Sequence, residues 1–131
     1  MKPRAKVLIV EDNSDVRRLY AIGLNQRGFE VKVAADGAQA VERISTERPD
    51  VILLDWLMPL MDGSQVLAKI AEDDLCDVPI IVISGQPAPE GPDMDPRICA
   101  WLTKPITIDQ IVAEISKPLR ERAEAIRPST V

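Results

Sequence analysis

VILLD, residues 51–55, is a run of four aliphatic residues that ends in an aspartate. It is too short for a helix and apolar on both faces that a strand presents, which is typical of a central strand in a parallel sheet. Two other runs share this character, VLIV at residues 7–10 and IIVI at residues 80–83. The three runs predict the buried centre of one parallel sheet.

Two flanking strands and several helices are predicted around this centre. FEVKV, residues 29–33, alternates apolar and polar side chains, as a half-exposed edge strand does, and AWL, residues 100–102, is a weaker candidate for a fifth strand. Residues 36–39 and 107–110 resemble capping boxes that open helices. Between the first two strands, apolar residues follow helical spacing at Val16, Leu19, Tyr20 and Leu24.

Because strand and helix alternate, the chain is predicted to form a doubly wound, flavodoxin-like α/β sandwich. The sheet would have five parallel strands, and the edge character of residues 29–33 favours the strand order 2-1-3-4-5. In such sheets the functional site lies beyond the carboxyl ends of the strands.

A proline-rich segment, GQPAPEGPDMDP at residues 85–96, lies where a fourth helix would be expected. Each proline lacks an N–H donor and clashes with the preceding turn, so this helix should be absent or reduced to about one turn that begins at Pro96 and is capped by Asp95. The segment could form a partner surface, a lid near the site or a tolerated loop replacement, and the sequence leaves these alternatives open.

The length of 131 residues suits one domain with one core. Pro118 is predicted to kink or end the last helix near Lys117. We therefore expect the domain to occupy residues 1–117 and a charged C-terminal extension or linker to occupy residues 118–131.

Composition excludes several classes of function. The net charge of −5 argues against direct nucleic-acid binding and against an anionic membrane surface. No apolar stretch has transmembrane length, and Cys76 and Cys99 lack metal-ligand spacing, so we expect a cytoplasmic protein. The chain contains no histidine, and any phosphohistidine chemistry therefore requires a second protein.

Polar residues follow the predicted strands at the functional edge of the sheet. Glu11 and Asp12 follow the first strand and Asp55 ends the third, and such a group of carboxylates calls for a hard cation such as Mg2+. Ser84 and Lys104 follow the fourth and fifth strands and could stabilise a phosphoryl group. Any one of these residues alone would be explained as a cap or a turn, but all five together indicate a site.

Four segments closely resemble those of two-component receiver domains, over essentially residues 6–116. They are VLIVEDN (7–13), LLDWLMPLMDG (53–63), IVISG (81–85) and WLTKP (101–105). The resemblance implies a response-regulator receiver domain that takes a phosphoryl group from a histidine kinase or a histidine phosphotransfer protein. It would be no enzyme toward other substrates and would catalyse only its own phosphorylation and dephosphorylation.

The resemblance also implies residue roles. Asp55 would be the phosphoacceptor, and the Mg2+ ligands would be Asp55, Asp12, Glu11 through a water molecule, and the Leu57 carbonyl. Further roles fall to Lys104 as phosphoryl contact, Ser84 as switch hydroxyl and Trp101 as switch aromatic. The Lys104–Pro105 peptide bond is often cis in this family.

Three other functions fit the sequence less well. A hydrolytic phosphatase on a related sheet would need a second carboxylate two residues after Asp55, where Leu57 stands. A receiver-like module that is never phosphorylated fits poorly with the complete set of site residues. A flavin-binding protein would need a glycine- or hydroxyl-rich phosphate loop after the first strand, where Glu11 and Asp12 would repel phosphate.

Overall fold

The computed structural model describes residues 4–56, 63–72, 78–88 and 95–125. The elements run in the order β1 (Lys6–Val10), α1 (Ser14–Gln26), β2 (Glu30–Ala34), α2 (Gly37–Glu47), β3 (Val51–Asp55), α3 (Gly63–Glu72), β4 (Ile80–Ser84), β5 (Ile98–Thr103) and α4 (Ile108–Ala125).

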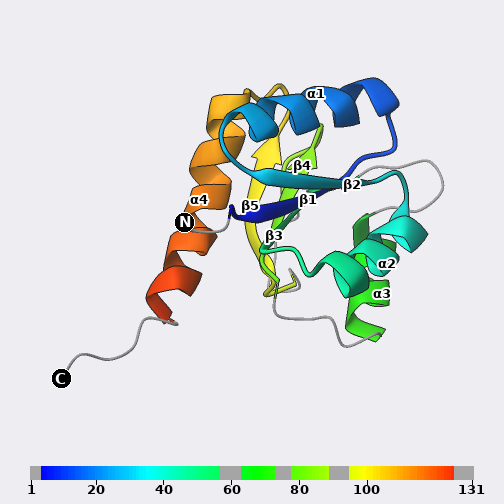
Figure 1. Ribbon diagram of the computed structural model, residues 1–131. Coiled ribbons are helices and arrows are strands. Elements are labelled where there is room, and N and C mark those ends of the chain that lie inside the picture. The colour runs from blue at the N-terminus through cyan, green and yellow to red at the C-terminus, as the bar shows by residue number, and fades with distance from the viewer. Residues whose placement is uncertain (1–3, 57–62, 73–77, 89–94, 126–131) are drawn as a thin grey trace.

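All five strands pair in parallel, in the order β2-β1-β3-β4-β5. Figure 1 shows α1 and α4 on one face of the sheet and α2 and α3 on the other. The predicted doubly wound sandwich and its strand order are therefore confirmed.

The apolar runs are buried on both faces of the sheet, as their composition predicted. Along β1, Leu8 and Val10 pack with α2 and α3, whereas Val7 and Ile9 pack with α1 and α4. The same alternation holds along β3, where Ile52 and Leu54 face one core and their neighbours face the other. Each central strand thus joins two apolar layers, which holds its carboxyl end in a fixed place.

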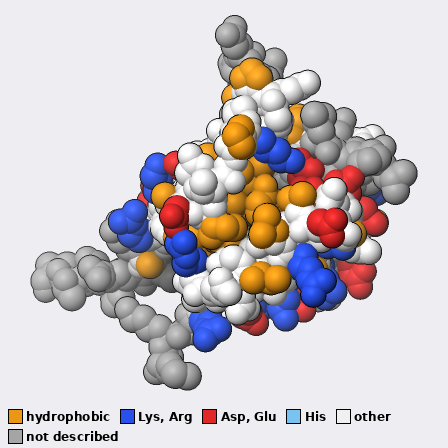
Figure 2. All heavy atoms as spheres, turned by 90° about the horizontal axis from the view of Figure 1, so that it is seen from above, with side chains coloured by type: hydrophobic (Ala, Val, Ile, Leu, Met, Phe, Trp, Pro, Cys, Tyr) orange, Lys and Arg blue, Asp and Glu red, His pale blue; other side chains and the backbone are white. Residues whose placement is uncertain are grey.

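Helix α1 packs through a narrower stripe than its sequence suggested. Tyr20 and Leu24 are buried, but Leu19 is 63% exposed and Ile22 is 50% exposed. Figure 2 shows hydrophobic side chains gathered near the middle of the face that lies uppermost in Figure 1, the side on which α1 lies. The stripe follows the four-residue spacing of Val16, Tyr20 and Leu24, so Leu19 lies outside it.

No helix lies between β4 and β5 in the described residues 85–88 and 95–97. Asp95 forms a turn there, since its Oδ1 accepts a hydrogen bond of 2.9 Å from the Arg97 N–H and its carbonyl accepts one of 3.0 Å from the Ile98 N–H. The prediction of at most one turn capped by Asp95 agrees with this arrangement.

Of the two predicted effects of Pro118, a kink or an end of the last helix near Lys117, the end is wrong, because α4 continues through Pro118 to Ala125. A proline removes one helical N–H donor. Here Pro118 is itself buried, and Leu119 packs against the core beneath α1 and α4. Arg122 also donates a 2.7 Å hydrogen bond to the Asp50 carbonyl oxygen. These contacts hold the second half of α4 against the rest of the domain.

Within the described part of the chain, none of the helices combines the length and the apolar character needed to cross a bilayer.

Candidate functional site

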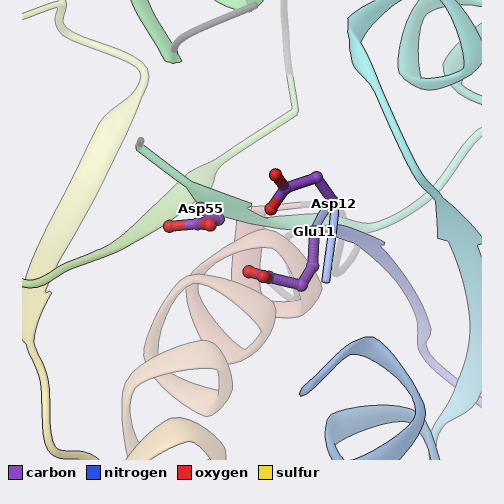
Figure 3. Close-up of side chains that lie close together, drawn as sticks. All are labelled: Glu11, Asp12 and Asp55. Atoms are coloured by element: carbon purple, nitrogen blue, oxygen red, sulfur yellow. The ribbon is translucent and has the colours of Figure 1, made fainter. Parts of the chain in front are cut away.

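Three carboxylates meet at the carboxyl edge of the sheet, as the sequence predicted (Figure 3). Glu11 directly follows β1, Asp12 comes next, and Asp55 ends the neighbouring strand β3. One carboxylate oxygen from each lies within 4.8 Å of the others. Glu11 is only 3% exposed and Asp55 6% exposed, so most of this charge is shielded from water.

The turn between β1 and α1 is fixed at both ends. The Glu11 N–H donates to the Ala34 carbonyl oxygen at 3.1 Å, which continues the pairing of β1 with β2. Asn13 caps α1, since its Oδ1 accepts from the N–H groups of Asp15 and Val16, each at 3.0 Å. The Asn13 N–H donates to Glu11 Oε1 at 3.3 Å. Local capping chemistry therefore sets the direction of the acidic pair.

The pKa of Glu11 is raised from 4.5 to about 8, mainly by burial and also by a hydrogen bond with the neighbouring Asp55 and by the charge of Asp55. The Asn13 N–H and the Lys104 ammonium oppose this increase. Burial, followed by the charges of Glu11 and Asp55, also raises the pKa of Tyr20. The cluster thus holds more negative charge than its surroundings stabilise, and a bound cation would relieve the excess.

The donor set suits a hard divalent cation. All three side chains offer carboxylate oxygens, which are the ligands that Mg2+ prefers, and they come from two rigidly paired strands. The residues present therefore fit the ion that the sequence predicted. The fourth expected ligand, the Leu57 carbonyl, lies outside the described residues.

Lys104 and Ser84 approach the same edge from β5 and β4. Lys104 Nζ lies 3.7 Å from Asp55 Oδ1, and the Lys104 N–H donates to the Ser84 carbonyl oxygen at 2.8 Å. The Lys104–Pro105 peptide bond is cis, as the resemblance implied. Ser84 is 1% exposed, and its Oγ accepts a 3.1 Å hydrogen bond from the Gln86 N–H.

The two tryptophans lie beside the site and touch each other. The ring centroids of Trp56 and Trp101 are 4.9 Å apart, with an angle of 57° between the planes. Trp101 Nε1–H donates to the Gln86 carbonyl oxygen at 2.9 Å. Gly63 makes room for Trp56, because a Cβ there would lie 2.2 Å from Trp56 Cε3. Gln86 thus connects Ser84 to Trp101 through its own peptide groups.

One residue at the site was missed by the sequence reasoning. The Arg17 side chain donates from Nη1 to the Glu11 carbonyl oxygen at 2.9 Å and lies 3.4 Å from that of Asp12. A cation near a helix N-terminus is unfavourable with respect to the helix dipole, and that conflict was the available signal.

Comparison with known proteins identifies the family. Residues 7–116 match the model of the response regulator receiver domain. The chain belongs to this family. Receiver domains of response regulators accept a phosphoryl group on an aspartate, and the acidic cluster described above fits such a site. Response regulators work with histidine kinases.

Relatives of known sequence agree with this assignment. The chain is 35% identical to the transcriptional regulatory protein PrrA of Mycobacterium bovis over 132 residues, covering 95% of this chain and 54% of PrrA. It is 31% identical to the phosphate regulon transcriptional regulatory protein PhoB of Pseudomonas aeruginosa, covering 87% of this chain and 51% of PhoB. The chain thus spans about half the length of these curated relatives.

Solved structures of receiver domains have the same fold. A CheY-like receiver domain protein from Methanospirillum hungatei superposes with a TM-score of 0.78 at 27% identity, covering 91% of this chain and 98% of that one. The chemotaxis protein CheY4 of Vibrio cholerae gives a TM-score of 0.75 at 28% identity, covering 88% and 98%.

Proposed function

We propose that Asp55 is the aspartate that accepts the phosphoryl group in this receiver domain. The observation that supports this best is that its carboxylate lies close both to the other two acids and to a cation. Its side chain belongs to the acidic cluster, and its Oδ1 also lies 3.7 Å from Lys104 Nζ. A phosphoryl group on Asp55 would therefore lie next to both of the groups that can neutralise it.

As the receiver-domain family implies, the donor would be a phosphohistidine of a histidine kinase or a histidine phosphotransfer protein, and this chain itself contains no histidine that could serve. An Asp55 carboxylate oxygen attacks the phosphorus in line, the bond from phosphorus to the donor's imidazole nitrogen breaks, and an acyl phosphate forms. The Lys104 ammonium stabilises the charge on a phosphoryl oxygen, and the Ser84 hydroxyl turns from the Gln86 N–H to donate to another.

Asp12, Asp55, the Leu57 carbonyl and, through water, Glu11 would hold Mg2+ at this site. When bound, Mg2+ would supply positive charge beside the phosphoryl oxygens and so lower the repulsion between them and the carboxylates. The role of the protein residues is then to place Asp55 for attack and to exclude bulk water, which the burial of Asp55 supports.

Movement of Ser84 would convert the chemistry into a signal. Gln86 holds Ser84 Oγ by its N–H and Trp101 Nε1 by its carbonyl, so a change at Ser84 alters the contacts of Trp101. We propose that Trp101 then rotates inward, and that a downstream output domain or protein recognises the altered surface. Hydrolysis of the acyl phosphate resets the domain, and it would be moderately slow because the Leu57 side chain cannot orient a water molecule.

Phosphorylation with a small donor tests the proposal. Incubation with acetyl phosphate and Mg2+, or with a phosphorylated histidine kinase, should attach one acid-stable, base-labile phosphoryl group, measured by intact-protein mass spectrometry. Asp55→Asn should abolish the labelling, whereas Asp15→Asn, an exposed aspartate on α1, should keep it. Labelling that survives Asp55→Asn would place the acceptor elsewhere and refute the assignment.

A further inference from the structure

Arg17 links helix α1 to the backbone that bears two of the three clustered carboxylates. Its guanidinium donates to the Glu11 carbonyl oxygen at 2.9 Å and makes a longer contact of 3.4 Å with the Asp12 carbonyl oxygen. Both contacts are partly buried. The same residue is held in α1 by its own N–H, which donates to the Asn13 carbonyl oxygen at 2.9 Å. One side chain thus spans the whole turn from β1 to α1.

The conformation of this turn is electrostatically unfavourable, because it brings a carboxylate oxygen of Glu11 and one of Asp12 within 4.8 Å of one of Asp55. Gathering three acidic groups in a place largely shielded from water costs free energy, and this cost favours any backbone movement that separates them. The Glu11 N–H is tied to Ala34, which fixes one side of the peptide chain. Arg17 fixes the other side through the carbonyl oxygens. The turn is therefore held in the arrangement that a cation needs before the cation arrives.

We propose that Arg17 is a positioning residue for the divalent cation, acting through the backbone of Glu11 and Asp12 and not through its charge. The inference rests on the proposed function, since it assumes that the acidic cluster binds Mg2+. The hydrogen bonds go to carbonyl oxygens, which leaves the carboxylate oxygens available to the metal. Loss of the guanidinium lets the turn relax away from Asp55, and metal binding must then restore its geometry.

The sign of the effect separates this role from a simple charge effect. A guanidinium close to a divalent cation repels it, so removing the positive charge alone would tighten Mg2+ binding. Removing an anchor of the metal-bearing turn would weaken Mg2+ binding instead. A purely structural role would lower the stability of the metal-free protein and leave the Mg2+ dissociation constant unchanged.

The test is a Mg2+ titration of the unphosphorylated protein, followed by calorimetry or tryptophan fluorescence, with thermal unfolding in EDTA measured in parallel. We expect Arg17→Met, which keeps most of the aliphatic stem, to raise the dissociation constant about tenfold, in the range of one lost hydrogen bond from a charged group. Arg17→Lys keeps the charge and one donor and should give an intermediate value. Arg18→Met, the exposed neighbour, is the matched control and should bind Mg2+ as the natural protein does.

An Arg17→Met protein with unchanged or tighter Mg2+ binding would overturn the positioning role. If Arg17→Met does not fold in EDTA, Arg17→Lys gives the decision, because unchanged or tighter Mg2+ binding by this variant overturns the role too. A natural protein that binds no Mg2+ would instead refute the proposed metal site, and this inference with it.

Discussion

At Glu11, burial and the charge of Asp55 act in the same direction, and they raise the pKa of this carboxyl to about 8. In the metal-free protein Glu11 is therefore mostly protonated near neutral pH, whereas a Mg2+-bound cluster requires the carboxylate. We predict that the Mg2+ association constant rises by about tenfold per pH unit well below pH 8 and levels off around it, because one proton is released on binding. Calorimetric titrations at pH 6, 7 and 8 would measure this slope.

Glu11→Gln provides the control, since the amide cannot titrate and its Mg2+ affinity should vary little over this range. A flat pH profile for the natural protein would contradict the prediction. The same residue sets a stability trend in EDTA. Its folded-state pKa lies above 4.5, so the metal-free protein should lose stability as the pH rises from about 4.5 to about 8. Excess Mg2+ should reverse that loss, as thermal unfolding can show.

The side chains at strand ends could be predicted from the sequence, whereas Arg17 could not. Asp55, Ser84 and Lys104 end or follow recognisable strands, and parallel strands bring their carboxyl ends to one edge. Arg17 acts on backbone carbonyl oxygens, which every residue possesses, so residue types do not reveal its partners, and its unfavourable place near the N-terminus of α1 is the one signal that the sequence offers. The Trp56–Trp101 contact likewise depends on the space left at Gly63, which becomes apparent only in the folded structure.

At the scale of elements, prolines coincide with the absence of a helix in one place and lie within a continuous helix in another. The prolines of residues 85–96 were expected to prevent a helix between β4 and β5, and the described parts of that connection contain none. Pro118 was expected to kink or end the last helix, and it does not end it. The difference lies in packing, because Pro118 is buried and the next turn reaches the core through Leu119. Sequence alone gives the local cost of a proline but not the tertiary contacts that offset it.

The second half of α4 is therefore predicted to stabilise the sheet. A chain ending at Lys117 lacks Leu119, which packs against the core, and Arg122, which bonds to Asp50 between α2 and β3. We expect its free energy of unfolding in urea to fall by about 1–3 kcal/mol. A chain ending at Ala125 keeps both contacts and should match the full chain. Equal stability of all three would instead support a domain that ends at residue 117, which remains the prediction from sequence.

At the scale of the whole molecule, two short chains of contacts join the carboxylate site to Trp101, on the surface that we propose changes on phosphorylation. Asp55 ends β3 and is followed by Trp56, whose ring contacts Trp101 on β5. A second connection runs from Ser84 through Gln86 to the Trp101 indole N–H. Both connections cross from β3 and β4 to β5, the edge strand of the sheet. Under the proposed mechanism, a change at Asp55 would reach the sheet edge through these contacts.

The two tryptophans of the chain make this coupling measurable. In Trp56→Phe, the emission comes from Trp101 alone, and adding Mg2+ with beryllofluoride, an acyl-phosphate mimic, should shift it to shorter wavelength. The physical reason is that Trp101 is half-buried in the present state and loses contact with water if it rotates inward when Ser84 turns toward the mimic. In Trp101→Phe only Trp56 emits. A change in emission that also appears in this variant would come from a direct effect of the ion on the site and not from movement of Trp101.

Asp55→Asn in the Trp56→Phe background is the matched control, because it removes the attachment point of beryllofluoride and should abolish the shift. Binding of the mimic is followed independently by fluorine NMR, which does not depend on the tryptophans. If fluorine NMR shows bound beryllofluoride while the Trp101 emission stays constant, the two connections do not transmit the change. The readout would then have to use a surface other than β5, and the Ser84–Gln86–Trp101 path would be structural only.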